Sequence, residues 1–400
     1  MAIISVDGHV KASRTIYRQY FENRYLDTFD YWVRSQEAAD VPDAGNLQPQ
    51  LNVESQWDSQ LRLRDLESQG VVAEVLFPNG LPFGDRRFED AGFSHDHDLD
   101  RQARLAYNRW LADFCGETPG RRAGQALVAF DDVEQAVGDI HWAKEHGLGG
   151  IMMPALEPGG TFFFDPVLDP VWAACVDVDL PISQHGGTGA PAYHPPGFAA
   201  LMTLATEHSF FSGRSLWQMI LGGVFDRFPD LRLVFVETEA DWIAPAIEKI
   251  DRRLGWGDDW MGFSTHIGRL RQFKKFAREY WASNCYAGIS PFTATQVPME
   301  HLADGSGAPN SGAFHIGADN AMFGVDYPHF ESIFPETKGH VAEMIADPSI
   351  NDEVAAKILY GNAARVYNFD LDALMPDIER VGFDLSEIDG GVHTVTSTFR

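Results

Sequence analysis

Cysteine is scarce in this chain of 400 residues, which has Cys115, Cys175 and Cys285 far apart and in no metal-type or CxxC spacing. So few cysteines exclude a disulfide framework and are typical of a reducing compartment. The N-terminus, MAIISVDGHVK, lacks the basic segment and long apolar stretch of a secretory signal. We therefore expect a cytoplasmic protein.

Basic residues and long apolar runs are also few. Lys and Arg number 31 against 58 Asp and Glu, so the formal net charge is −27 with neutral histidine. Nucleic-acid phosphates and anionic membrane surfaces attract surplus positive charge, so neither is an expected partner. No run approaches the roughly 18 apolar residues of a membrane helix. Phosphate-loop, nicotinamide and nucleic-acid motifs are missing as well, which leaves a small or medium organic molecule as the expected partner.

Short apolar runs are present instead, and each is followed by a segment with helical spacing. Several runs are continuous rather than alternating, as in parallel strands that helices cover. Their repetition predicts a single (β/α)8 barrel, a TIM-like fold, over residues 1–369. An open doubly wound sheet is the alternative, but no GxGxxG motif follows an early strand. The eight runs are Ala2–Val6, Val72–Phe77, Gln125–Ala129, Gly150–Met153, Leu180–Ser183, Leu231–Val236, Trp281–Tyr286 and Ala321–Val325.

Helix boundaries are marked by capping residues. Asp132 is predicted to cap a helix that ends near Gly147, and Asp169 with Pro170 is predicted to open another. Helical apolar spacing also appears in the stretches 215–226 and 352–367.

Two segments exceed a minimal barrel. Residues 10–65 are too long for an ordinary loop after the first strand, so we expect a cap insertion over the barrel mouth. Residues 370–400 follow the last helix and are expected to form a surface or subunit-contact extension, compatible with a homodimer.

Four predicted strands end in residues that can bind a metal. The first ends in Asp7 and His9, the fifth in His185, the sixth in Glu237 and the eighth in Asp326. Active sites of (β/α)8 barrels lie at the carboxyl ends of the strands, and imidazole and carboxylate groups are ligands of divalent metals. A single such residue would more simply be a helix cap, but four equivalent strand ends favour a metal centre.

Four further residues are candidates, each with a structural alternative. Glu74 lies within the second strand and is expected either to contact the metal or to pair with a barrel Arg or Lys. His329, just past Asp326, is expected near the substrate or behind the ligands. Lys11 and His194 are candidate substrate-binding residues, with a surface position as the alternative for both.

His95 and His97 resemble a metal-binding pair, but their segment, SHDHDLD, is polar and precedes a helix. A solvated helix start is therefore the preferred interpretation of these two histidines.

The motifs D-x-H, HGG and G-x-D-Y-P-H resemble the amidohydrolase superfamily, and most closely its amidohydrolase-related (amidohydrolase 2) branch, which contains aromatic-acid decarboxylases and carbon–carbon hydrolases. The resemblance spans about residues 2–368 and implies metal ligands at Asp7, His9, His185 and Asp326, with Asp326 also a general base. Further similar stretches are QGVVAEVLFPN, AYNRWLADFC, LGGVFDRFPDLRLVFVE, MFGVDYPHFES and ILYGNAARVYNF.

One residue departs from the family pattern. Most relatives with hydrolase or decarboxylase activity carry a His at the end of the sixth strand, where this chain has Glu237. Glu237 either binds or bridges a metal or orients a ligand from behind. Bridging carboxylates suit two iron ions, and this variant resembles a non-haem diiron hydroxylase that acts on a bulky diterpenoid in natural-product biosynthesis.

The favoured expectation is therefore a non-haem diiron hydroxylase, a monooxygenase that uses dioxygen, with Glu237, Asp326 and His329 as the catalytic residues. The alternative keeps the same ligands with zinc or manganese and predicts a hydrolase or non-oxidative decarboxylase. A third possibility is a metal-free barrel that serves only as a binding protein.

Overall fold

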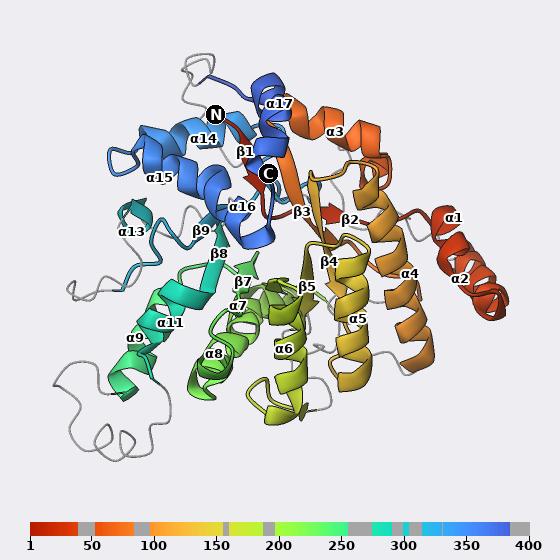
Figure 1. Cartoon of the computed structure of the whole chain (residues 1–400). Coiled ribbons are helices and arrows are strands. Elements are labelled where there is room, and N and C mark those ends of the chain that lie inside the picture. The colour runs from red at the N-terminus through yellow and green to blue at the C-terminus, as the bar shows by residue number, and fades with distance from the viewer. Residues whose placement is uncertain are drawn as a thin grey trace.

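The structure, a computed structural model, is a barrel of parallel strands with helices around it (Figure 1). The residues that it describes are 1–38, 53–83, 97–154, 160–186, 197–254, 274–289, 299–303, 314–329 and 331–384.

The strands follow one another around the barrel in the order β1-β3-β4-β5-β6-β7-β8-β9, and every neighbouring pair is parallel. The short strand β2 pairs with the end of β3. Both faces of these strands are buried, as is usual where helices cover a parallel sheet, which confirms the predicted (β/α)8 barrel. The strands are β1 (Ile3–Ser5), β2 (His9–Val10), β3 (Val71–Pro78), β4 (Arg122–Leu127), β5 (Gly150–Met153), β6 (Ile182–His185), β7 (Leu233–Val236), β8 (Cys285–Ile289) and β9 (Ala321–Phe323).

The segments that follow β1 and β9 meet and close the barrel. The Asp326 N–H donates to the Asp7 carbonyl at 3.0 Å, and the His9 N–H donates to the Tyr327 carbonyl at 2.7 Å. Gly8 and Tyr327 also form a parallel bridge. The junction of residues 6–9 with residues 325–329 is termed the closing seam below.

Helices connect the strands and begin and end at identifiable residues. The Asp132 side chain accepts a hydrogen bond from Gln135 N at 3.0 Å and caps α5, while Gly147 follows that helix with φ of +77°. The helices are α1 (Arg14–Tyr17), α2 (Leu26–Ala38), α3 (Ser59–Ser68), α4 (His97–Gly116), α5 (Val133–Glu145), α6 (Asp169–Asp177), α7 (Phe198–Leu221), α8 (Val224–Arg227), α9 (Ile243–Leu254), α11 (Ala277–Asn284), α13 (Met299–Ala303), α14 (Thr337–Ala346), α15 (Asp352–Ala356), α16 (Asn362–Tyr367) and α17 (Leu371–Val381).

Shorter helical turns complete the connections. Between α15 and α16 the chain continues as a π-helical turn, so the stretch predicted as one helix over 352–367 is helical throughout. These turns are η1 (Arg18–Tyr20), η2 (Asn23–Tyr25), η3 (Val53–Gln56), η6 (Pro166–Leu168) and η7 (Lys357–Gly361).

Two predicted boundaries are wrong. The apolar run 281–286 was assigned to a strand, but its first part belongs to α11 and the strand begins at Cys285. Asp169 is the first residue of α6 rather than its cap, because η6 runs directly into that helix. Asp165 caps η6 instead, since its side chain accepts from Val167 N at 3.0 Å.

The insertion after β1 packs in part on the outside of the barrel. In Figure 1, α1 and α2 lie beside α4, and the Tyr17 ring meets Trp110 edge-on at 5.8 Å between centroids. Further along the insertion, η3 and α3 lead back to β3. Residues 39–52 lie outside the described part, so a cap over the barrel mouth stays a prediction.

The C-terminal extension, as far as residue 384, packs on its own chain. Met1 and Phe383 exchange hydrogen bonds through their backbone groups, and Arg380 in α17 pairs with Glu67 in α3 at 2.6 Å. A subunit contact through this extension stays a prediction. Of the helices that the structure describes, none has both the length and the apolar character required to cross a membrane.

Candidate metal centre

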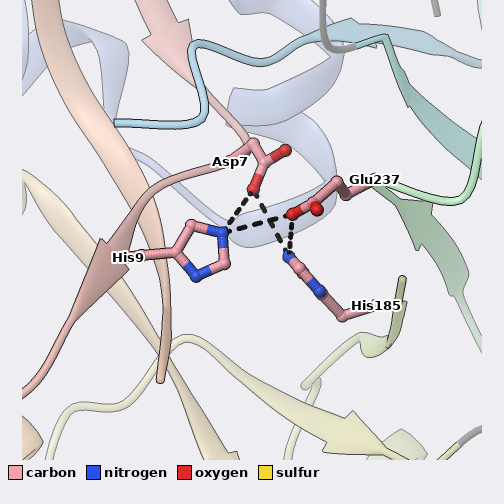
Figure 2. A group of neighbouring side chains, drawn as sticks. All are labelled: Asp7, His9, His185 and Glu237. Carbon is pink, nitrogen blue, oxygen red and sulfur yellow. Dashed lines mark ion pairs between the residues drawn. The ribbon is translucent and has the colours of Figure 1, made fainter. Parts of the chain in front are cut away.

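Side chains from four strand ends converge at the carboxyl end of the barrel. They form two groups, and within each group the potential ligand atoms all lie within 4.8 Å of one another. His9 and Glu237 belong to both groups, which therefore make one cluster. The first group is Asp7, His9, His185 and Glu237 (Figure 2), and the second is His9, Glu237, Asp326 and His329.

In the first group, two imidazoles alternate with two carboxylates. His9 Nε2 lies 3.4 Å from Asp7 Oδ1 and 3.4 Å from Glu237 Oε2. His185 Nε2 lies 3.5 Å from Asp7 Oδ1 and 3.2 Å from Glu237 Oε2. Figure 2 shows all four side chains pointing at a common centre.

The second group extends the cluster toward the end of the closing seam. Asp326 Oδ1 lies 3.2 Å from His9 Nε2 and 2.9 Å from His329 Nδ1. The His329 nitrogen is also 3.9 Å from Glu237 Oε2. The rings of His9 and His329 are stacked, with 3.6 Å between their centroids.

Most of these side chains are buried, and four of the atoms that face the centre lack hydrogen-bond geometry. Asp7, His9, His185 and Asp326 are at most 2% exposed. His9 Nε2, Glu237 Oε2, Asp326 Oδ1 and His329 Nδ1 approach one another, yet none of them meets hydrogen-bond geometry. Polar atoms buried in this way are costly unless a further group satisfies them. A divalent cation at the common centre would satisfy them.

The histidine rings present the nitrogen that a cation requires. His185 Nδ1 lies 2.9 Å from the Gly186 carbonyl, and His9 Nδ1 lies 3.5 Å from the Pro78 carbonyl. A proton on Nδ1 that faces a carbonyl leaves Nε2 as the lone-pair nitrogen, and Nε2 is the atom that faces the cluster in both residues.

The charges of the cluster stabilise one another. Burial alone would raise the pKa of Asp7, but the adjacent imidazoles of His185 and His9 lower it well below its ordinary value. Burial alone would lower the pKa of His9, but Asp326, Asp7 and Glu237 together raise it well above its ordinary value. Asp7 therefore stays ionised in a buried setting, as a metal ligand must, and a bound cation would take the place of the proton that these carboxylates hold on His9.

Unusual backbone conformations aim two of the carboxylates. Glu237 has φ of +52° and Asp326 has φ of +57°, a left-handed region that few non-glycine residues adopt. Gly186 makes room for this turn, because a Cβ on Gly186 would lie 1.9 Å from the Glu237 carbonyl oxygen. Strained residues of this kind are concentrated at functional sites.

Glu74 does not belong to the cluster, contrary to the expectation that it contacts the metal. Its carboxylate binds Arg62 through Nε and Nη2, with Oε2 at 2.7 Å from Nη2, and Arg122 lies 3.4 Å away. Glu74 sits in the middle of β3, so its side chain meets α3 and β4 rather than the strand ends. The alternative prediction, an ion pair with a barrel arginine, is confirmed.

The remaining sequence candidates are not assigned a role by the structure. Lys11 directly follows β2 and is half-buried, and its contact with a substrate stays a prediction. His194 and His95 lie outside the described residues. His97 is the first residue of α4, as expected for a helix start, and its side chain is not described.

Two residues near the cluster were missed from sequence. Asn79 Oδ1 lies 3.4 Å from His329 Nε2, where it can accept a hydrogen bond from that ring, and the Asn79 amide donates to Gln56 at 2.8 Å. Glu331 lies 4.0 Å from His329, and burial together with the negative charge of Asp326 raises the pKa of Glu331 to about 7. The only sequence signal for Glu331 was its position two residues beyond His329, a predicted catalytic residue.

Comparison with known proteins gives a family and a fold. The sequence profile of a family described as Amidohydrolase matches residues 82–369. Solved structures match nearly the whole chain at low sequence identity. An amidohydrolase from Mycobacterium avium subsp. paratuberculosis is 17% identical with a TM-score of 0.68, and the match covers 92% of this chain and 99% of that one.

Decarboxylases are among the matching structures. The 5-carboxyvanillate decarboxylase of Novosphingobium aromaticivorans, with manganese and 4-hydroxy-3-methoxy-5-nitrobenzoic acid, is 18% identical with a TM-score of 0.59 and coverage of 92% of this chain and 96% of that one. The 2,6-dihydroxybenzoate decarboxylase from Rhizobium is 18% identical with a TM-score of 0.58, and the match covers 93% of this chain and 99% of that one.

Proposed function

The chain belongs to the amidohydrolase family, and from that premise we propose that it is a divalent-metal-dependent enzyme that removes a carboxyl group from a small organic acid without dioxygen. Hydrolysis of a carbon–carbon or amide bond at the same centre is the closest variant of this proposal. Hydroxylated aromatic acids are the first substrate class to test.

One observation carries the metal-dependent part of the proposal. His9, Glu237, Asp326 and His329 direct buried atoms at one point without hydrogen-bond geometry between them. Nitrogen and carboxylate oxygen together suit zinc, manganese or iron. Asp7, His9, His185 and Asp326 would hold the ion, with Glu237 as a further ligand, and the bound ion would supply Lewis-acid polarisation of a carboxylate or carbonyl.

The protein side chains supply orientation and proton handling. In decarboxylation the bond between the carboxyl carbon and its neighbour breaks, the electron pair stays on the neighbour, CO2 leaves, and that neighbour takes up a proton. Asp326 Oδ1 and His329 Nδ1 are 2.9 Å apart at the edge of the cluster, close enough to pass that proton once the two groups align. Burial of Asp326 keeps bulk water from this proton.

The decarboxylases among the similar structures support the reaction class, and the manganese in one of them supports the metal class. Because these structures are 18% identical to this chain, they support the choice only through a shared fold. The reaction must therefore be established by measuring CO2 release from this protein directly.

The decisive experiment combines metal analysis with CO2 release. We expect purified protein to contain at least about one divalent ion per chain and to release CO2 from a member of a hydroxybenzoate panel. The rate should be the same in air and under argon, and chelation followed by Mn²⁺ or Zn²⁺ should abolish and restore it. Protein that binds no metal, as a binding-only barrel would, contradicts the proposal.

A second candidate is the iron-dependent hydroxylase, which the ligand set favours. Three carboxylates face the histidines, and His9 and Glu237 are shared between the two groups, an arrangement in which a carboxylate can bridge two ions. This candidate requires iron, dioxygen and a reductant. A product that gains one oxygen atom in air and no turnover under argon would establish it in place of decarboxylation.

A further inference from the structure

We propose that Arg62 is a positioning residue for the metal centre. Arg62 holds the closing seam in the register that brings Asp7 and His9 against Asp326 and His329. The inference rests on the proposed metal-dependent function, and it concerns a residue that touches none of the inward-facing ligand atoms.

The guanidinium of Arg62 binds both sides of the closing seam. Arg62 Nη1 donates to the His9 carbonyl at 3.0 Å, and Nη2 donates to the Tyr327 carbonyl at 3.3 Å. The Tyr327 carbonyl also accepts from the His9 N–H, so a single guanidinium ties together the backbone of β2 and the segment after β9. Backbone register in this place decides where the adjacent ligands point.

The residue between two candidate ligands lies directly against this guanidinium. A Cβ on Gly8 would lie 2.9 Å from Arg62 Nη2 and 3.1 Å from Glu74 Oε2. Gly8 does not have a positive φ, so its need for a small residue is steric. The close approach therefore explains the central position of the D-x-H motif: a side chain there would displace Arg62 or the seam.

The guanidinium is itself held on every side. Glu74 pairs with it through two atoms, and its centre lies 5.1 Å above the Tyr327 ring. The Tyr327 hydroxyl in turn donates to Asp65 at 2.6 Å, on the same helix as Arg62. Arg62 is 0% exposed, so these contacts are shielded from water and fix its geometry tightly.

A lysine cannot reproduce this arrangement. The planar guanidinium reaches one carboxylate and two carbonyls at fixed angles, whereas an ammonium is a single point with three donors on a flexible stem. Arg62→Lys keeps the positive charge next to Glu74 and should therefore loosen the seam without leaving a buried carboxylate unpaired.

The test is a Mn²⁺ titration followed by electron paramagnetic resonance, which counts free and bound ion. We expect Arg62→Lys to weaken Mn²⁺ binding about 10- to 100-fold relative to the unaltered protein and to change the signal of the bound ion. Arg278→Lys is the matched control, because Arg278 is also buried and paired, with Asp251 at 2.6 Å, but joins α9 to α11. The control should bind Mn²⁺ within about 2-fold of the unaltered protein.

A second variant covers the case in which Arg62→Lys does not fold. Arg62→Met combined with Glu74→Met removes both charges together, and apolar replacement of a whole buried pair is often tolerated. Arg122 loses its contact with Glu74 in that variant, but it keeps its hydrogen bonds to Ser59 and to the Phe114 carbonyl, and the net buried charge is the same as in the original trio. It should fold and show the same weakened binding.

The outcomes separate this inference from the proposed function. Unchanged Mn²⁺ affinity in a folded Arg62 variant, or an equal loss in Arg278→Lys, would overturn the positioning role alone. Failure of the unaltered protein to bind Mn²⁺, Zn²⁺ or Fe²⁺ would overturn the proposed function together with it.

Discussion

Glu237 and Glu74 are glutamates on strands of the same barrel, but their carboxylates meet opposite surroundings. Glu74 lies in the middle of β3, where Arg62 and Arg122 neutralise it. Glu237 follows β7, where its Oε2 faces other potential ligands and makes no hydrogen bond. The contrast shows how to separate scaffold from site: satisfied buried charge holds the barrel together, and unsatisfied buried charge indicates a missing ligand.

The largest effect is expected at Asp326, and its absence would mean that the cluster only stabilises the fold. Asp326→Asn removes a carboxylate from the cluster while it keeps the shape of the side chain, so we expect turnover to fall about 10²- to 10⁴-fold. Steady-state kinetics of CO2 release measure this loss. Circular dichroism is the control, and it should show an unchanged fold. Activity within tenfold of the unaltered enzyme would remove Asp326 from the catalytic residues.

The scaffold side of the contrast is tested by Glu74→Gln. Arg62 and Arg122 would keep their charges in the barrel interior without a counter-ion, so we expect the free energy of unfolding to fall by about 3–5 kcal/mol. Urea unfolding of the metal-free protein measures this change.

Glu237→Gln is the matched variant at the metal centre. It removes the same charge from a side chain that is 28% exposed and has both histidines and carboxylates as neighbours, so the opposing effects largely cancel and the free energy of unfolding of the metal-free protein should change by less than about 1 kcal/mol. An equal loss of unfolding free energy in Glu74→Gln and Glu237→Gln would contradict the distinction between a glutamate with ion-pair partners and one without hydrogen bonds.

A finer test concerns a residue behind the cluster. Asn79 Oδ1 faces His329 Nε2 at 3.4 Å and favours the tautomer that leaves Nδ1 free for the cluster. Asn79→Ala should therefore lower kcat about tenfold with little change in stability. Asn79→Gln is the comparison variant, and a complete absence of effect in both would show that His329 needs no such support.

The smallest effect is expected at the far side of α3, where Glu67 pairs with Arg380 and Arg121 near the surface. These partners hold the pKa of Glu67 at about 2, below its ordinary value of 4.5. The folded protein therefore gains stability above about pH 4.5 and loses it as pH falls toward 2. Glu67→Gln should cost at most about 1 kcal/mol at pH 7 and less at pH 3, as measured by urea unfolding at both pH values.

The barrel could be predicted from sequence because each strand is a short apolar run with a helix after it. The meeting of strand-end residues such as Asp7, His185 and Glu237 could then be predicted as well, because a parallel barrel brings the carboxyl ends of its strands to one face. The run at 281–286 was misjudged because a short apolar stretch suits a buried helix as well as a strand.

The surroundings of a polar residue could not be predicted in the same way. The sequence around Glu74 does not indicate that Arg62, on the preceding helix, forms an ion pair with it. The contribution of Asn79 was equally hidden, because it depends on the distance between two side chains that are far apart in the chain.

The closing seam also determines when the metal centre can exist. Its ligands come from both ends of the barrel sequence, Asp7 and His9 near the start and Asp326 and His329 near the finish. A growing chain on the ribosome carries the first pair long before its partners have been made. We therefore expect metal capture to require the completed barrel, because a truncated product that stops before β9 would lack Asp326 and His329 and could not form the closing seam.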